Sequence, residues 1–281
     1  MHFLSDEIDF AAYERETDAA ANVKPASVWM DELIHKLQNP DRTKKVLLPW
    51  EQAHGLFAFR PGEVTLWAGQ NGHGKTQIVS QVVLSLMGQE EKVVVGSFEM
   101  KPGTTLAMMC RMYAQTNPFS PEYQGEQGVQ ILTELYKEFG EWTDSRLWVY
   151  DRQGTVDARQ VLGMARYCAK ELGVTHIVID SLMKCVMGED DYNGQKAFVD
   201  ELTALARDNM VHVHLIHHLR KPSKETDIPD KHDTKGSGAI TDLVDNLMLV
   251  WRNKGKEDDI KAKGRASTKK DEHDAAILCR K

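Results

Sequence analysis

Several features that would place this chain of 281 residues in other functional classes are missing. No apolar run approaches the roughly 18 to 20 residues of a membrane-spanning helix. The first residues have neither the basic region nor the apolar stretch of a signal peptide. We therefore expect a cytoplasmic protein with no membrane partner.

Cysteine is scarce, and the four cysteines lie far apart without a C-x-x-C pair. This spacing fits reduced thiols in the cytosol and excludes zinc-finger modules. A large positive charge is also missing, because the formal net charge is −7. That balance argues against a protein coated in nucleic acid, but it leaves open a local basic lining, such as the stretch from Arg252 to Arg265.

The clearest positive signal is an octapeptide that fits the P-loop pattern G-x-x-x-x-G-K-[ST] at every fixed position. Strand formers precede it, and apolar residues at helical spacing follow it. In such a loop, backbone N–H groups surround phosphate oxygens, the lysine reaches the β- and γ-phosphates, and the hydroxyl ligates Mg²⁺. We predict a site for ATP, or another NTP or dNTP, with Mg²⁺, formed by Gly69, Gln70, Asn71, Gly72, His73, Gly74, Lys75 and Thr76.

Strand-like and helix-like segments alternate after this loop, which predicts an α/β fold with a mainly parallel twisted sheet and helices on both faces. Strands are expected at 92–98, 147–150, 174–179, 211–217, 245–251 and 275–278. Helices are expected from about Gly103 and at 127–139, 156–172 and 194–209. Two polar segments, 219–238 and 253–273, are predicted to be long loops.

The chain divides into an ATPase domain at 51–281 and an N-terminal extension at 1–50. The extension contains a short amphipathic helix at about 26–38. Such a helix must bury its apolar face, and it packs either on its own domain or on a neighbouring subunit. The residues expected on that face are Val28, Met30, Leu33, Ile34 and Leu37.

Two apolar strands end in acidic residues, Glu99 and Asp180. In a parallel sheet these strand ends share one rim with the phosphate loop. Asp180 is then placed to hold Mg²⁺ beside Thr76, and Glu99 to orient the attacking water. The alternatives are a carboxylate that caps a turn and a solvated glutamate.

The segment from Val211 to His218 contains four histidines. Its end can place an imidazole on the same rim, near the γ-phosphate. Alternation puts His212 and His214 on one face of the strand, so a metal site and ordinary sheet-surface histidines are the other interpretations.

Four blocks in this order resemble the RecA-like hexameric helicases of superfamily 4, which include the DnaB-type replicative helicases and the helicase half of phage primase-helicases. The blocks are Arg60–Glu63 before the phosphate loop, Ser97–Met100, Ile177–Leu182, and Gly236–Ile240 followed by Asp245–Met248.

The resemblance implies a RecA-like core, a role for each matching residue, and a set of partners. Glu99 matches the catalytic glutamate, His218 the γ-phosphate sensor, and Arg252 a residue that stacks on the nucleotide base. The helix near Trp29 matches one that docks on the adjacent subunit. The implied partners are single-stranded DNA, further copies in a hexamer, and a primase or other replication proteins, in a bacterial cell or phage-infected host. The residues that match DNA-binding loops are Arg220, Lys221, Lys224, Gly236, Ser237 and Gly238.

The chain departs from the family pattern at its end. In the family, the last strand ends in a lysine, here matched by Lys281, and an arginine finger for the neighbouring subunit follows about two residues later. Either the chain is truncated before the finger or Arg280 serves in a shifted register. We therefore expect a helicase motor on single-stranded DNA, with a RecA-like recombinase or regulatory ATPase, and a non-hydrolysing nucleotide-binding scaffold, as alternatives.

Overall fold

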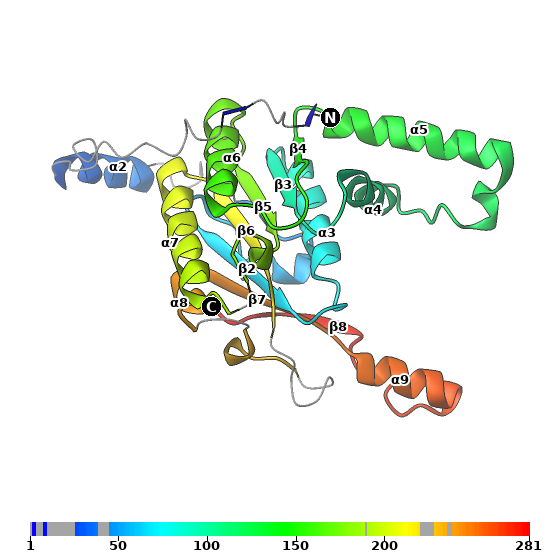
Figure 1. The fold of residues 1–281 in the computed structure, drawn as a ribbon. Coiled ribbons are helices and arrows are strands. Elements are labelled where there is room, and N and C mark those ends of the chain that lie inside the picture. Colours follow the sequence, from blue (N-terminus) through cyan, green and yellow to red (C-terminus); the bar gives the residue numbers. More distant parts are fainter. Residues whose placement is uncertain are drawn as a thin grey trace.

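A twisted sheet organises the protein (Figure 1). The computed structural model describes residues 2–3, 8–9, 26–38, 45–188, 190–219, 228–234 and 238–281. Within these residues the sheet has eight strands in the order β1-β4-β3-β5-β6-β2-β7-β8. All neighbours are parallel except β7 and β8, which are antiparallel. The strands are β1 (His2–Phe3), β2 (Val64–Gly69), β3 (Val93–Ser97), β4 (Leu147–Tyr150), β5 (His176–Asp180), β6 (His212–His218), β7 (Asn246–Arg252) and β8 (Ala275–Cys279).

Helices cover both faces of this sheet, as Figure 1 shows. One apolar core joins the sheet to α6 (Ala158–Glu171), α7 (Tyr192–Asn209) and α8 (Gly238–Leu243). A second core joins the other face to α3 (Lys75–Gly88), α4 (Pro102–Ala114) and α5 (Gly125–Thr143). Successive strand residues alternate between the two cores, for example Leu66 and Trp67. The strands read as continuous apolar runs because both of their faces are buried, and the predicted fold class is confirmed.

The prediction of a long loop at 253–273 is wrong, because this segment contains α9 (Lys254–Lys263). Polar contacts hold it in place. Asn253 caps the helix by accepting the Lys256 N–H at 2.9 Å. The buried Lys256 ammonium donates to the Glu272 carbonyl and lies 3.0 Å from an Asp274 oxygen. A helix fixed in this way has no apolar stripe, so hydrophobic periodicity does not reveal it.

The expected N-terminal helix is present as α2 (Ala26–Gln38). Four apolar side chains at helical spacing remain 47 to 78% exposed: Met30, Leu33, Ile34 and Leu37. The described residues of its own subunit therefore do not bury this stripe. The side chains of Val28 and Trp29 lie outside the described part of the helix.

Candidate nucleotide site

The phosphate loop connects the buried strand β2 to the N-terminus of α3. Gly72 and Gly74 have φ angles of 76° and 84°, which residues other than glycine rarely adopt. At Gly69, an added Cβ would lie 2.7 Å from the carbonyl oxygen of Val250, so the neighbouring strand also excludes a side chain there. These conformations turn the loop around the N-terminus of α3, where an anion binds favourably.

Lys75 is already directed into this loop. Its ammonium group donates to the carbonyl oxygens of Gly69 at 2.9 Å and Gln70 at 3.0 Å. Burial lowers the pKa of Lys75, whereas the carboxylates of Asp180 and Glu99 act in the opposite direction. The side chain is 7% exposed in relative terms, so a buried cation is held where phosphate oxygens would arrive.

Thr76, in the first turn of α3, contacts Asp180 at the end of β5. The Thr76 hydroxyl donates to Oδ2 of Asp180 at 2.8 Å, and Asp180 is buried at the end of β5. Burial raises the pKa of Asp180, and the bond from Thr76 partly offsets this. A hydroxyl beside a carboxylate at a phosphate loop offers the hard oxygen donors that Mg²⁺ prefers, so the donor set fits this ion.

Glu99 follows β3, the strand that pairs with β5. Its Oε1 accepts a hydrogen bond from the Ser181 hydroxyl at 2.8 Å and lies 3.5 Å from Nε2 of His218. The contact with His218 is the main reason that the pKa of Glu99 falls to about 2, although burial opposes the shift. The sequence did not identify Ser181 as a contact of Glu99. The only available signal was a hydroxyl directly after the strand-end aspartate.

The structure thus brings together five of the predicted residues at the carboxyl ends of the parallel strands: Lys75, Thr76, Glu99, Asp180 and His218. Arg280 and Lys281 lie elsewhere. Strand β8 runs antiparallel to β7, so the Arg280 N–H donates to the Leu247 carbonyl at the start of β7. Leu247 lies five residues before Arg252 at the carboxyl end of β7, so this point is about 17 Å from that end at roughly 3.3 Å per residue.

Most of the residues predicted to bind DNA are not among those that the structure describes. Arg220, Lys221, Lys224, Gly236 and Ser237 all lie outside them. Gly238 is described and is the first residue of α8.

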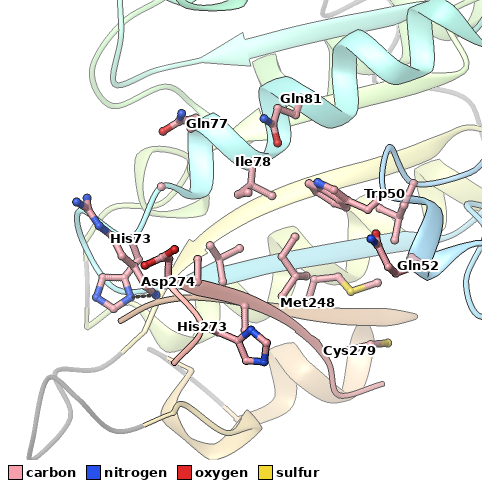
Figure 2. Close-up of a pocket in the computed structure, with 18 of the residues that line it drawn as sticks. Trp50, Gln52, His73, Gln77, Ile78, Gln81, Met248, His273, Asp274 and Cys279 are labelled. Atoms are coloured by element: carbon pink, nitrogen blue, oxygen red, sulfur yellow. Dashed lines mark hydrogen bonds between the residues drawn. The ribbon is translucent and has the colours of Figure 1, made fainter. Parts of the chain in front are cut away.

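A groove of about 990 Å³ opens beside the phosphate loop (Figure 2). One wall is α3, the floor is formed by β7 and β8, and the segment around Trp50 closes the far end. Nδ1 of His73 accepts the Arg252 N–H at 3.2 Å, which ties the loop to the end of β7. Polar groups at the loop end include Gln77, Arg252, Glu257, His273 and Asp274.

The histidine-rich strand corrects two of the sequence interpretations. His212 and His214 are not on the sheet surface, since they are 1% and 0% exposed beneath the ring of Phe59. The described residues also contain no group of three or more His, Cys, Asp or Glu that could hold a metal ion. Only His218 at the far end of the strand belongs to the rim constellation.

A family model for the AAA domain AAA_25 matches residues 25–224, which is well over half of the chain. The chain belongs to this AAA domain family. Among solved structures, this AAA domain is similar to the ATPase domain of G40P, with a TM-score of 0.72 and 15% identity over 92% of this chain and 95% of that one.

A second solved structure is that of a DnaB-like replicative helicase, described with its interactions with primase. It has a TM-score of 0.66 and 15% identity over 92% of this chain, which spans 64% of that protein. At such identity the likeness establishes the fold of this AAA domain, namely the RecA-like ATPase fold of DnaB-like helicases. None of the helices in the described part of the chain is long and apolar enough to cross a membrane.

Proposed function

We propose that this protein is an ATP-driven motor that moves along single-stranded DNA as a hexameric ring, in replication of the phage or plasmid type. The observation that carries the proposal is the rim constellation of Lys75, Thr76, Glu99, Asp180 and His218. It combines a buried cation, an oxygen pair suited to Mg²⁺ and an ionised carboxylate next to an imidazole. The RecA-like fold and the AAA family membership support it.

In this proposal, each rim residue acts on the triphosphate. Lys75 contacts the β- and γ-phosphates. Thr76 and Asp180 would hold Mg²⁺, which would supply positive charge to offset the charge on the phosphate oxygens. Glu99 accepts a hydrogen bond from the attacking water and so orients it. A carboxylate with a pKa of about 2 is a weak base, which favours this orienting role over removal of a proton before attack. Ser181 and His218 fix the carboxylate in that position.

The placement of Arg280 supports an assembly in which a neighbour completes each site. Because Arg280 lies about 17 Å along β7 from the strand end beside its own phosphate loop, it cannot reach its own nucleotide. An arginine from this end of β8, or shortly after it, is instead available to the next subunit. The unburied apolar stripe of α2 gives a second contact between copies, and deleting it would weaken the ring.

His218 also connects the nucleotide site, along the chain, to the residues that we propose bind DNA. It lies at the end of β6, directly before the segment that contains Arg220, Lys221 and Lys224. We propose that these cations, with the Gly236–Gly238 segment, bind backbone phosphates of single-stranded DNA without reading sequence. A primase or another replication protein is the further partner in this proposal.

The decisive experiment measures ATP hydrolysis with and without single-stranded DNA, together with strand displacement, for the wild type and Glu99→Gln. We expect DNA-stimulated hydrolysis and strand displacement in the wild type. In the variant, hydrolysis should fall about 10²-fold or more with ATP binding nearly intact. Because Ser181 donates to Glu99, Ser181→Ala should cause a smaller loss in the same direction.

The possible outcomes separate the functional classes. Hydrolysis without strand displacement would favour a recombinase or regulatory ATPase. Nucleotide binding without hydrolysis in the wild type would favour a scaffold. Unchanged hydrolysis in Glu99→Gln would assign the water-orienting role to another residue.

A further inference from the structure

A second arginine interaction lies at the edge of the nucleotide site, outside the rim constellation. The guanidinium of Arg252 is bound by both carboxylate oxygens of Glu257, with Nε–Oε1 at 2.5 Å and Nη2–Oε2 at 3.0 Å. Its third nitrogen, Nη1, faces the carbonyl oxygen of Gly72 in the phosphate loop at 3.5 Å. The edges of the guanidinium are therefore occupied, and its plane is fixed.

Glu257 is itself held by the way α9 is attached. It lies in the first turn of this helix, which Asn253 caps. One residue earlier, Lys256 binds the Glu272 carbonyl and Asp274, which precede β8. The contact of Asn253 with the Glu272 carboxylate at 2.9 Å adds a further tie. The first turn of α9 is thus attached at several points, and it presents Glu257 to Arg252 at the wall of the groove.

The groove beside the phosphate loop has room for a nucleoside. It begins at His73 and Gly74, continues along α3 past Gln77 and Ile78, and is mainly apolar (Figure 2). The sugar and base of a triphosphate held by the loop would have room at this end of the groove. Arg252 and Glu257 both line that end.

We propose that Glu257 is a positioning residue for nucleobase binding, because it holds the guanidinium of Arg252 flat so that the base can stack on its open face. This inference rests on the proposed nucleotide site. A carboxylate bound in the plane leaves the two faces of a guanidinium free, and those faces stack well on flat rings. Stacking of this kind accepts any base, so Glu257 contributes to the affinity for nucleotides in general and not to the affinity for their phosphates.

The charges in the pair agree with this role. The bond from Arg252 lowers the pKa of Glu257, and the bond to Glu257 raises the pKa of Arg252, so both groups remain ionised at neutral pH. Asp258 offers a matched control. It is exposed, carries the same charge one residue later, and does not line the groove.

The test compares ATP with inorganic tripolyphosphate as ligands for the whole protein without DNA. In Glu257→Ala, the Kd and KM for ATP should rise about two- to fivefold, the range of an exposed cation–π contact. The Kd for tripolyphosphate and the kcat should stay within about twofold of the wild type. Asp258→Ala should leave all four values unchanged, and Glu257→Gln should give an intermediate rise for ATP.

A double-mutant cycle with Arg252→Ala decides whether Glu257 acts through Arg252. We expect the double variant to bind ATP no more weakly than Arg252→Ala alone, because the two residues form one unit. Additive losses would overturn the proposal, as would an equal loss of tripolyphosphate binding or equal effects of Glu257→Ala and Asp258→Ala. If the wild type bound neither ligand, the nucleotide site itself would fail. If it bound ATP but showed no DNA-stimulated turnover, the proposed motor function would be contradicted and the inference on Glu257 would not.

Discussion

The two ends of β6 carry the same residue type in opposite surroundings. At the carboxyl end, the His218 side chain is 21% exposed and faces the carboxylate of Glu99. At the amino end, His212 and His214 are buried and bond to the side chains of Thr65 and Trp67 in β2. The difference shows that the role of a histidine in a parallel sheet depends on its place along the strand, because only the carboxyl end opens onto the ligand rim.

The buried end forms a directed hydrogen-bond network. Nδ1 of His214 accepts the Trp67 indole N–H at 3.3 Å, so its Nε2 carries the proton and donates to Nδ1 of His176 at 3.1 Å. Nδ1 of His212 donates to the Arg60 carbonyl at 2.7 Å, and its Nε2 accepts from the Thr65 hydroxyl at 2.8 Å. These bonds satisfy polar groups that would otherwise be costly to bury.

The comparison predicts that rim substitutions remove activity without loss of stability. In Lys75→Ala, ATP hydrolysis should fall to background, a loss of about 10³-fold or more, and nucleotide binding should weaken. The free energy of unfolding should not decrease, because burial already disfavours this ammonium group. Phosphate release and urea denaturation measure the two quantities, and wild-type turnover in this variant would remove the basis for the nucleotide site.

Substitutions at the amino end of β6 should lower stability and leave activity nearly unchanged. His214→Ala leaves a cavity and removes the partner of the Trp67 indole, so the free energy of unfolding should fall by about 3 to 4 kcal/mol. The kcat of the folded fraction should stay within about twofold of the wild type.

The matched control for His214→Ala is the same substitution at the other end of the strand. His218→Ala should lower turnover and change stability by less than about 1 kcal/mol, since that side chain is partly exposed. Equal effects of the two variants on both quantities would contradict the division of β6 into two functional ends.

Low pH should lower the free energy of unfolding mainly through the buried histidines at the amino end of β6. Burial lowers the pKa of His212 to about 4, whereas an ordinary histidine titrates near 6.5. Between these values the unfolded chain binds a proton that the folded chain does not, so stability falls as the pH decreases. The loss should amount to about 3 kcal/mol between pH 7 and pH 4, and His214 adds to it in the same direction.

Urea unfolding at a series of pH values measures this dependence. His212→Gln, which cannot titrate, should have a visibly shallower slope over the same range. Glu99 also begins to lose stabilisation near pH 4.5, because its pKa is lowered to about 2, but it does so in both proteins and therefore cancels when the two slopes are compared. An unchanged slope in His212→Gln would assign the acid sensitivity to other groups.

The sequence predicted the sheet and most of the rim because both depend on local patterns. Strands buried on two faces appear as apolar runs, and parallel pairing then brings Glu99 and Asp180 to the end that holds the phosphate loop. The helix α9 and the pair of Arg252 with Glu257 escaped prediction, since side-chain bonds without an apolar pattern form them.

The alternative interpretation of His212 and His214 as sheet-surface histidines was wrong for a related reason. Alternation correctly put His212 and His214 on one face, but the sequence did not show what covers that face. The cover is the ring of Phe59, from the segment before the phosphate loop, with ring centroids 4.9 and 4.8 Å from the two imidazoles. Contacts between segments so far apart in the chain are set by tertiary packing.

The locked imidazoles have a spectroscopic consequence. In most proteins, ring N–H protons exchange with water too fast to be observed singly, but those of His212 and His214 are buried and each is held by a defined acceptor. They should exchange only when the sheet opens, and thus appear as separate, slowly exchanging resonances. Since Thr65 and Trp67 belong to the strand that leads into the phosphate loop, these protons would report from inside the subunit whether nucleotide binding tightens that strand.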